Sequence, residues 1–206
     1  LDQATPVSFI ATGLPRIGRS SLLRHALVKC NIVRQSYECS AIVLRREESI
    51  EDLILKLFDL GFSASAYPTY LMTLTLDDRI NIAVSIVKDI QAAQEIVLIR
   101  DDGCLVNDTR ELQPWFDEIL RRVDGRPTFI ITERYRPRPE TLRTKPYVFS
   151  LPVPELTYQE RRGLFRRLME FEGLALSRED FVFFSGLFQG FPDQIQFACD
   201  MIRDLG

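Results

Sequence analysis

A short glycine-containing segment near the start of the chain has the residue types and spacing that bind phosphate. Residues 13–21 read Gly-Leu-Pro-Arg-Ile-Gly-Arg-Ser-Ser. The two glycines let the backbone curl so that successive amide N–H groups point inward, and a helix N-terminus behind them adds its positive dipole end. The segment matches Gly-x4-Gly-Lys-Ser/Thr except that Arg19 replaces the lysine. We therefore predict a phosphate-binding loop whose contacts are Gly13, Arg16, Ile17, Gly18, Arg19, Ser20 and Ser21.

Arg19 and Ser20 set what such a loop can do with a bound nucleotide. A guanidinium neutralises phosphate charge as lysine does, but it is larger, planar and more directional than an ammonium group. We therefore expect binding to survive the replacement and hydrolysis to be slow or absent. The hydroxyl of Ser20 is placed to contact Mg²⁺.

Two neighbouring carboxylates provide the acidic element that a magnesium nucleotide requires. Asp101 and Asp102 follow the apolar run 96–99, which predicts a buried strand that delivers them to the carboxyl edge of a sheet. We assign Asp101 to the metal, directly or through water, and Asp102 to orienting the attacking water. The alternative is an ordinary acidic turn.

An arginine follows another predicted strand and has two possible roles. Arg134 comes after the apolar run 128–132, so it can reach the same edge and sense a γ-phosphate, or it can be a solvated loop residue. Neither role is favoured. Other basic residues cluster nearby and later in the chain, at Arg136, Arg138, Arg143, Lys145, Arg161, Arg162, Arg166 and Arg167. A solvated face explains these clusters better than contact with nucleic acid.

Strand and helix patterns alternate over the first three quarters of the chain. Buried strands are predicted over 7–12, 41–44, 95–100, 128–132 and 147–151. Helices are predicted over 19–31, from Ser49 to Gly61, from Thr75 onward and over 108–123, with a loop over 62–73. This alternation predicts an α/β fold with a parallel five-stranded sheet covered by helices on both faces.

The remainder of the chain reads as helices alone. Thr157 with Glu160 and Ser177 with Asp180 have capping-box spacing, and a third helix is predicted to start near Pro192. The first of these helices is expected to bury the stripe Leu164, Leu168 and Phe171. We place the boundary between a nucleotide-binding domain, 1–151, and a small helical subdomain, 152–206.

Composition excludes several other classes of protein. The 206 residues carry a formal net charge of −3, which gives no global field for nucleic acid. The four cysteines form no C-x-x-C pair and His25, the only histidine, is expected on a helix surface, so a zinc site lacks ligands. No run of 18 apolar residues or signal peptide is present, so we expect a cytoplasmic protein without membrane contact.

In their order and spacing, four segments resemble the nucleotide-binding module of the STAND class of signal-transduction P-loop NTPases, which includes NB-ARC and NACHT proteins. GLPRIGRSSLLR resembles the family's glycine loop and IVLIRDD its acidic strand. FIITER resembles the strand that ends in a Thr-Thr-Arg sensor, with Glu133 in place of the second threonine, and LFQGFPDQIQFA resembles the Gly-x-Pro element of the helical subdomain.

The resemblance implies a ligand, partners and a function. Pro192 would contact a bound adenine nucleotide, ATP or ADP with Mg²⁺, and the module would act as a switch that controls homo-oligomerisation and effector activation in immune, antiviral signalling. Sensor and effector domains would belong to the same longer chain, of which this sequence is expected to be a piece. One alternative is an active remodelling ATPase of the AAA or archaeal type, whose Gly-x-Arg-Arg-x-Gly-Lys loops are also similar. Another is a scaffold with a decayed loop that binds no nucleotide.

Overall fold

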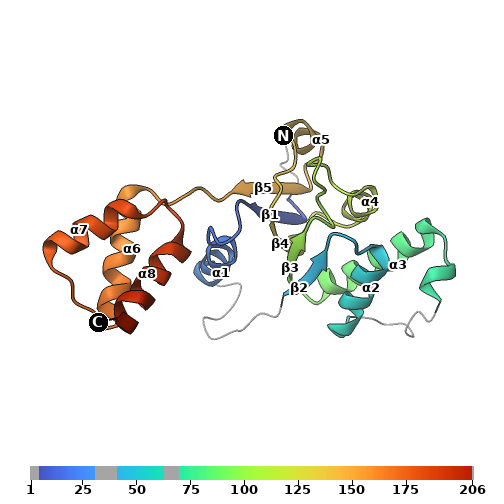
Figure 1. Cartoon of the computed structure of the whole chain (residues 1–206). Helices are drawn as coiled ribbons and strands as arrows, with labels where there is room; N and C mark the ends of the chain where they lie inside the picture. Colours follow the sequence, from blue (N-terminus) through green and yellow to red (C-terminus); the bar gives the residue numbers. More distant parts are fainter. Residues whose placement is uncertain (1–4, 31–40, 63–69, 206) are drawn as a thin grey trace. The chain divides into compact units, whose positions relative to one another are not determined.

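The computed structural model of the protein describes residues 5–30, 41–62 and 70–205. The chain divides into two compact units (Figure 1). The first contains residues up to 13 together with 23–152, and the second contains 14–22 together with 153 onward. The segment 14–22, which holds most of the predicted phosphate loop, therefore belongs to the same unit as the helical part of the chain.

The first unit is built on a parallel sheet of five strands. They are β1 (Ser8–Thr12), β2 (Ile42–Arg45), β3 (Val97–Asp102), β4 (Phe129–Glu133) and β5 (Val148–Pro152), in the order β2-β3-β4-β1-β5. This confirms the predicted α/β class and all five strands, each of which begins one or two residues later than expected. Because the strands are parallel, their carboxyl ends share one edge of the sheet, where β1 ends at Gly13 and β3 ends at the two aspartates.

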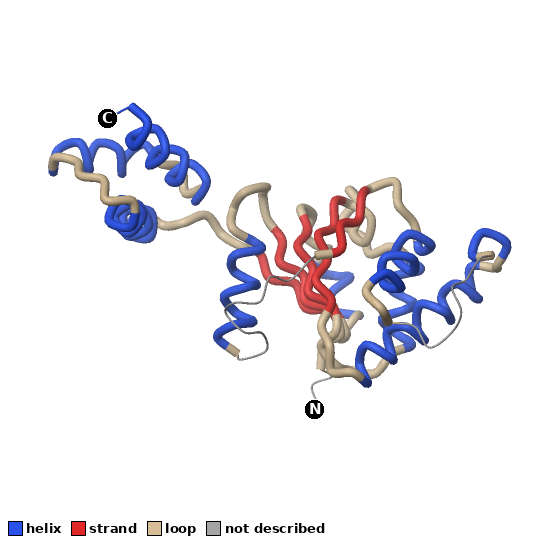
Figure 2. Tube along the Cα trace, turned by 90° about the horizontal axis from the view of Figure 1, so that it is seen from below, coloured by secondary structure: helices blue, strands red, loops and turns tan. Residues whose placement is uncertain are grey.

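Helices cover both faces of this sheet (Figure 2). The connections are α1 (Arg19–Lys29), α2 (Ile50–Asp59), α3 (Leu76–Ala92), α4 (Pro114–Arg122) and α5 (Pro139–Thr144). The link from β1 to the far strand β2 crosses the sheet in the opposite direction from the links that follow. Right-handed crossovers therefore put α1 on one face and α2, α3 and α4 on the other. Fully buried side chains such as Leu53, Phe116 and Phe129 fill the space beneath the second group.

Three helical details differ from the sequence-based prediction. The helix expected over 108–123 begins only at Pro114, because the preceding residues form a loop closed by a bridge between Val106 and Leu112. The short helix α5 was not predicted. Leu71–Thr73 forms one 3₁₀ turn within the predicted loop 62–73, much of which lies outside the described residues.

The helical part of the second unit contains α6 (Tyr158–Phe171), α7 (Arg178–Leu187) and α8 (Pro192–Leu205). The predicted caps are present: the Thr157 hydroxyl accepts a hydrogen bond from the Glu160 amide at 3.3 Å, and Ser177 does the same for Asp180 at 3.0 Å. The predicted buried stripe is wrong at Phe171, which is 88% exposed. Leu164 and Leu168 are partly buried against the core, which consists of Phe165, Met169, Phe188, Ile195 and Cys199.

Within the described ranges, none of these helices has both the length and the apolar character needed to cross a membrane.

Candidate functional site at the phosphate loop and strand ends

The predicted phosphate loop connects β1 to α1 and has the backbone shape that its glycines suggest. Gly18 has φ +95° and Arg16 has φ +64°, so two of its residues adopt the left-handed region that turns the chain sharply. The Ile17 amide donates to the carbonyl of Leu14 at 3.3 Å, and the Ile17 side chain is buried. A buried Ile17 anchors the bend from inside, which leaves the polar residues of the loop on the outside.

The first turn of α1 follows directly and contains the predicted hydroxyl ligands. Ser20 and Ser21 are exposed, and Arg19 is half-buried. Backbone N–H groups in the first turn of a helix have no acceptor within the helix, and they lie at the positive end of the helix dipole. The turn therefore offers amide donors and a hydroxyl to an anion, and phosphate binding there stays a prediction.

The start of α8 lies against this loop, within the second unit. A Cβ atom added to Gly18 would lie 3.7 Å from Cγ of Pro192, so the proline ring packs close to the backbone of the loop. One residue further on, Asp193 Oδ2 lies 3.0 Å from Arg16 Nη1. The structure thus brings together three of the predicted residues, Arg16, Gly18 and Pro192. It adds Asp193, which the sequence analysis missed.

The turn before Pro192 is held by a tight backbone contact. Gly190 has φ +94°, and a Cβ atom there would lie 2.9 Å from Cβ of Glu155 and 3.0 Å from the carbonyl oxygen of Leu156. The Leu156 amide donates to the carbonyl of Gly190 at 2.9 Å. Only glycine fits this position, which fixes how α8 begins relative to the segment that enters α6.

In the first unit, Asp101 is a buried residue with many hydrogen-bond partners. Its carboxylate accepts hydrogen bonds from the amides of Cys104, Leu105 and Val106 at 2.9 to 3.1 Å. These bonds hold the loop that replaces the first part of the predicted helix 108–123. Asp102 points the other way along the strand and is exposed.

Glu133, at the end of the neighbouring strand β4, is fully buried, and it follows Thr132, the residue paired with the one before Asp101. Burial, above all, and the neighbouring Asp101 carboxylate raise the pKa of Glu133 to about 9, although the Arg134 and Tyr135 amides act in the opposite direction. Burial also raises the pKa of Asp101. Because its pKa lies above neutral pH, Glu133 holds its proton beside the Asp101 carboxylate at pH 7.

The backbone around Glu133 connects this pair to the start of the phosphate loop. Oε1 of Glu133 accepts the amides of Arg134 at 2.6 Å and Tyr135 at 2.8 Å, and its carbonyl accepts the Gly13 amide at 3.3 Å. The Arg134 side chain is exposed and lies over the ring of Tyr135, 5.6 Å from its centre. The assignment of Arg134 as a γ-phosphate sensor stays a prediction.

The predicted ligands fit a nucleotide phosphate better than they fit a metal held directly by Asp101. The loop offers amide donors and cations, and the Ser20 hydroxyl is exposed. The Asp101 oxygens, in contrast, already accept hydrogen bonds from three backbone amides, which occupies most of the lone-pair positions of a carboxylate. Across the described residues, no group of three or more His, Cys, Asp or Glu side chains is placed to hold a metal ion. The exposed Ser20 hydroxyl stays the predicted ligand for Mg²⁺ bound with a nucleotide, and a metal contact of Asp101 stays a prediction.

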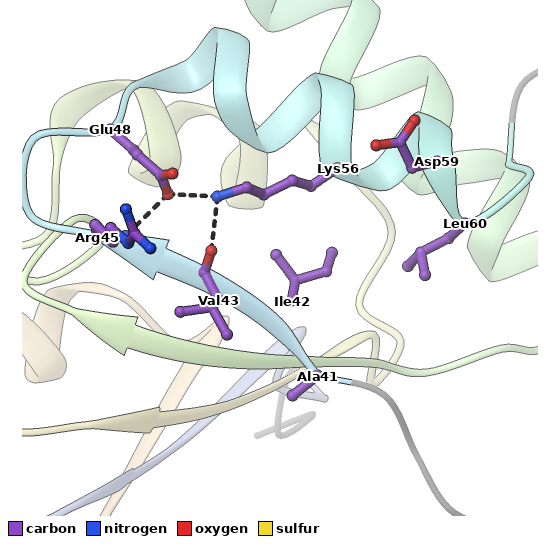
Figure 3. Close-up of a pocket in the computed structure, with 8 residues that line it drawn as sticks. All are labelled: Ala41, Ile42, Val43, Arg45, Glu48, Lys56, Asp59 and Leu60. Carbon is purple, nitrogen blue, oxygen red and sulfur yellow. Dashed lines mark hydrogen bonds and ion pairs between the residues drawn. The ribbon is translucent and has the colours of Figure 1, made fainter.

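A separate pocket of about 540 Å³ lies beside the edge strand β2 (Figure 3). Lys56 Nζ donates to the Val43 carbonyl at 2.6 Å and contacts Glu48, and Glu48 Oε2 accepts the Arg45 amide at 2.9 Å. These side chains hydrogen-bond to backbone groups of the edge strand β2, which protects the strand from pairing with another strand. None of the predicted site residues lines this pocket.

Comparison with known proteins identifies the fold. No family model and no curated protein matches the chain. Among solved structures, a Walker-type ATPase of Pyrococcus abyssi is 16% identical with a TM-score of 0.55, over 98% of this chain and 64% of that one. A STAND protein with a tetratricopeptide repeat sensor from Pyrococcus horikoshii is 18% identical with a TM-score of 0.59, over 94% of this chain and 27% of that one.

The likeness extends beyond the STAND class. The ORC2 protein of Aeropyrum pernix, solved as ADPNP–ADP complexes, is 12% identical with a TM-score of 0.53, over 99% of this chain and 59% of that one. The chain therefore spans less than two thirds of the length of each of these three structures. At such low identity the comparisons establish the P-loop ATPase fold and leave the class within it open.

Proposed function

We propose that the chain is the adenine-nucleotide-binding switch module of a STAND-type ATPase. In this role ADP or ATP with Mg²⁺ occupies the loop between β1 and α1, and the bound nucleotide controls oligomerisation and effector activation in immune, antiviral signalling. Hydrolysis is slow or absent because Arg19 replaces the lysine. Sensor and effector domains of the same longer chain would supply the trigger and the output.

One observation carries this proposal: the predicted phosphate loop lies against the first turn of α8. Pro192 packs on Gly18 in the loop, so a ligand that occupies the loop also meets the helical part of the chain. A ligand can shift the arrangement of a protein only if it binds one arrangement better than another, and a contact of this kind supplies that difference. Two of the similar structures are described as a STAND protein and as a complex with adenine nucleotides, which supports the same ligand class.

Calorimetric titration of the purified chain with ADP and with ATP, each with Mg²⁺, tests the proposal. We expect binding of both nucleotides, and we expect Gly18→Val to abolish it because Gly18 has positive φ and lies close to Pro192. Gly173→Val is the matched control, since Gly173 also has positive φ but lies at the C-terminus of α6, outside the loop. Absence of heat at millimolar nucleotide would leave only the scaffold with a decayed loop.

A second candidate is a remodelling ATPase of the AAA type, which the structural likeness also favours: the FIGL-1 AAA domain in complex with ADP matches with a TM-score of 0.53. Such an enzyme would turn over steadily. Sustained phosphate release by the unmodified chain would favour it over the switch.

A further inference from the structure

Arg16 and Asp193 form an ion pair between the bend of the loop and the first turn of α8. The Arg16 side chain is 77% exposed and that of Asp193 is 50% exposed, with Nη1 and Oδ2 3.0 Å apart. In the part of the chain that the structure describes, neither side chain makes another ion pair. The guanidinium at the loop is thus balanced by one carboxylate and remains open to solvent.

A phosphate bound in the loop would meet both charges. It would attract Arg16, since guanidinium groups bind phosphate oxygens with the same geometry as carboxylate oxygens. It would repel Asp193, which carries the same sign of charge. The positive end of the α8 dipole favours either anion, so it does not remove the conflict. Asp193 and a nucleotide phosphate therefore compete for one cation.

We propose that Asp193 sets the nucleotide affinity of this site by competing with the bound phosphates for Arg16, an inference that rests on the proposed function. Phosphate binding then releases Arg16 from Asp193 and loosens this contact between the loop and α8. By reciprocity, the ion pair lowers nucleotide affinity by the same factor.

The adjacent residue acts in the opposite direction. Pro192 makes an apolar contact with Gly18 that does not depend on charge, and a nucleotide that uses this proline binds better because of it. Two consecutive residues of α8 are therefore expected to have opposite effects on affinity. If replacing either residue only disturbed the start of α8, then Pro192→Ala and Asp193→Asn would both weaken nucleotide binding.

Calorimetric titration with Mg²⁺-ADP and Mg²⁺-ATP tests this for wild type, Asp193→Asn and Asp204→Asn. Asp204 is an exposed carboxylate on the same helix, eleven residues or about 16 Å further along, so its variant gains the same unit of charge far from the loop. We expect Asp193→Asn to bind about twofold to fivefold more tightly, the range of an exposed ion pair, and Asp204→Asn to match wild type.

Salt and a second substitution separate this mechanism from others. The gain in nucleotide affinity of Asp193→Asn over wild type should fall towards zero between about 0.1 M and about 1 M salt, because the screening length drops from about 10 Å to about 3 Å. In an Arg16→Ala background, which should itself weaken binding, Asp193→Asn should give a smaller gain. Asp193→Ser keeps a helix-capping oxygen and replaces the asparagine variant if thermal unfolding shows that the latter is misfolded.

The outcomes distinguish the two proposals. If wild type binds nucleotide and neither Asp193 variant binds more tightly at low salt, this inference is wrong and the proposed function stands. If wild type binds no nucleotide, both are wrong.

Discussion

Asp101 and Glu133 are both buried and directly follow the paired residues Arg100 and Thr132, so two carboxyl groups stand side by side at the ends of two neighbouring strands. The pair is buried at the edge of the sheet where the fold predicts a metal-binding carboxylate. Asp101 also organises the backbone of residues 104–106. Its first role is therefore structural, whatever it contributes to a bound metal.

The raised pKa of Glu133 makes the stability of the fold depend on pH. In the unfolded chain Glu133 loses its proton near the ordinary value of 4.5, whereas burial raises its pKa to about 9 in the folded protein. Between these values the folded state holds one more proton than the unfolded state, so the free energy of unfolding falls as pH rises. Glu133→Gln keeps a donor to Asp101 without a titrating proton, so the variant should gain stability relative to wild type as pH rises from 5 towards about 9.

Urea unfolding at several pH values measures this difference. Glu118→Gln is the control, because hydrogen bonds from Arg121 and Arg122 lower the pKa of Glu118 to about 2 and it stays ionised throughout the window. If the free energy of unfolding depends on pH in the same way for wild type and Glu133→Gln, then Glu133 holds no extra proton in the folded state.

The two neighbouring aspartates should respond differently to the same substitution. Asp101→Asn replaces one carboxylate oxygen with an amide group that faces backbone N–H donors, which should lower the free energy of unfolding by about 3 kcal/mol. Asp102→Asn alters an exposed side chain and should change it by less than about 0.5 kcal/mol. Chemical denaturation without nucleotide or metal measures both, and equal effects would contradict the structural role of Asp101.

Much of the fold could be predicted because its signals are local. Runs of apolar residues placed all five strands, and Ser or Thr three residues before an acid placed the helix starts at Thr75, Thr157 and Ser177. The start of α4 was misplaced because the Asp101 carboxylate draws the next amides into a loop. Pro114, which is favoured in the first turn of a helix, was the local signal for the true start.

Other features depend on contacts between distant residues. In α6, Leu164 and Leu168 pack partly buried against the core, whereas Phe171 is exposed. Helical spacing alone cannot show that Phe165 and Met169 are the fully buried residues, because only packing against α7 and α8 decides this. Arg16 and Asp193 are 177 positions apart, so their pairing has no local signature. Glu133 was noted as a departure from a sensor motif, but its role became apparent only beside Asp101.

The rate of ATP hydrolysis should depend on Arg19, the residue that departs from the usual phosphate-loop motif. Arg19→Lys restores the compact cation that fits between phosphate oxygens, so we expect a higher rate of phosphate release from ATP, and Asp102→Ala should lower any residual rate. Arg24→Lys provides a control at an exposed arginine later in the same helix. Brisk release by wild type, unchanged by Arg19→Lys, would contradict a limit set by Arg19.

The backbone at Gly190 should tolerate no side chain. Gly190→Ala places a Cβ atom within 3 Å of Glu155 at a positive φ, so it should destabilise the helical unit by more than about 1 kcal/mol. Gly186→Ala adds the same atom to an exposed position in α7 with nothing within 4 Å, and should stabilise the protein by about 0.5 to 1 kcal/mol. Thermal unfolding compares the two variants. Similar shifts in the midpoint temperature would show that the turn at Gly190 accommodates a side chain.

The contact of Pro192 with the phosphate loop should make the helical unit respond to nucleotide. If the proline touches a bound base, Pro192→Ala removes a few apolar contacts and should weaken ADP binding by about 1 kcal/mol, or roughly fivefold. Amide hydrogen exchange over residues 157–204 should then slow when ADP is added to wild type and change less in the variant. Pro139→Ala is the control, since Pro139 also opens a helix but lies in the other unit. Equal exchange with and without ADP, in wild type and in Pro192→Ala, would show that the helices do not sense the nucleotide and that the chain is not a switch.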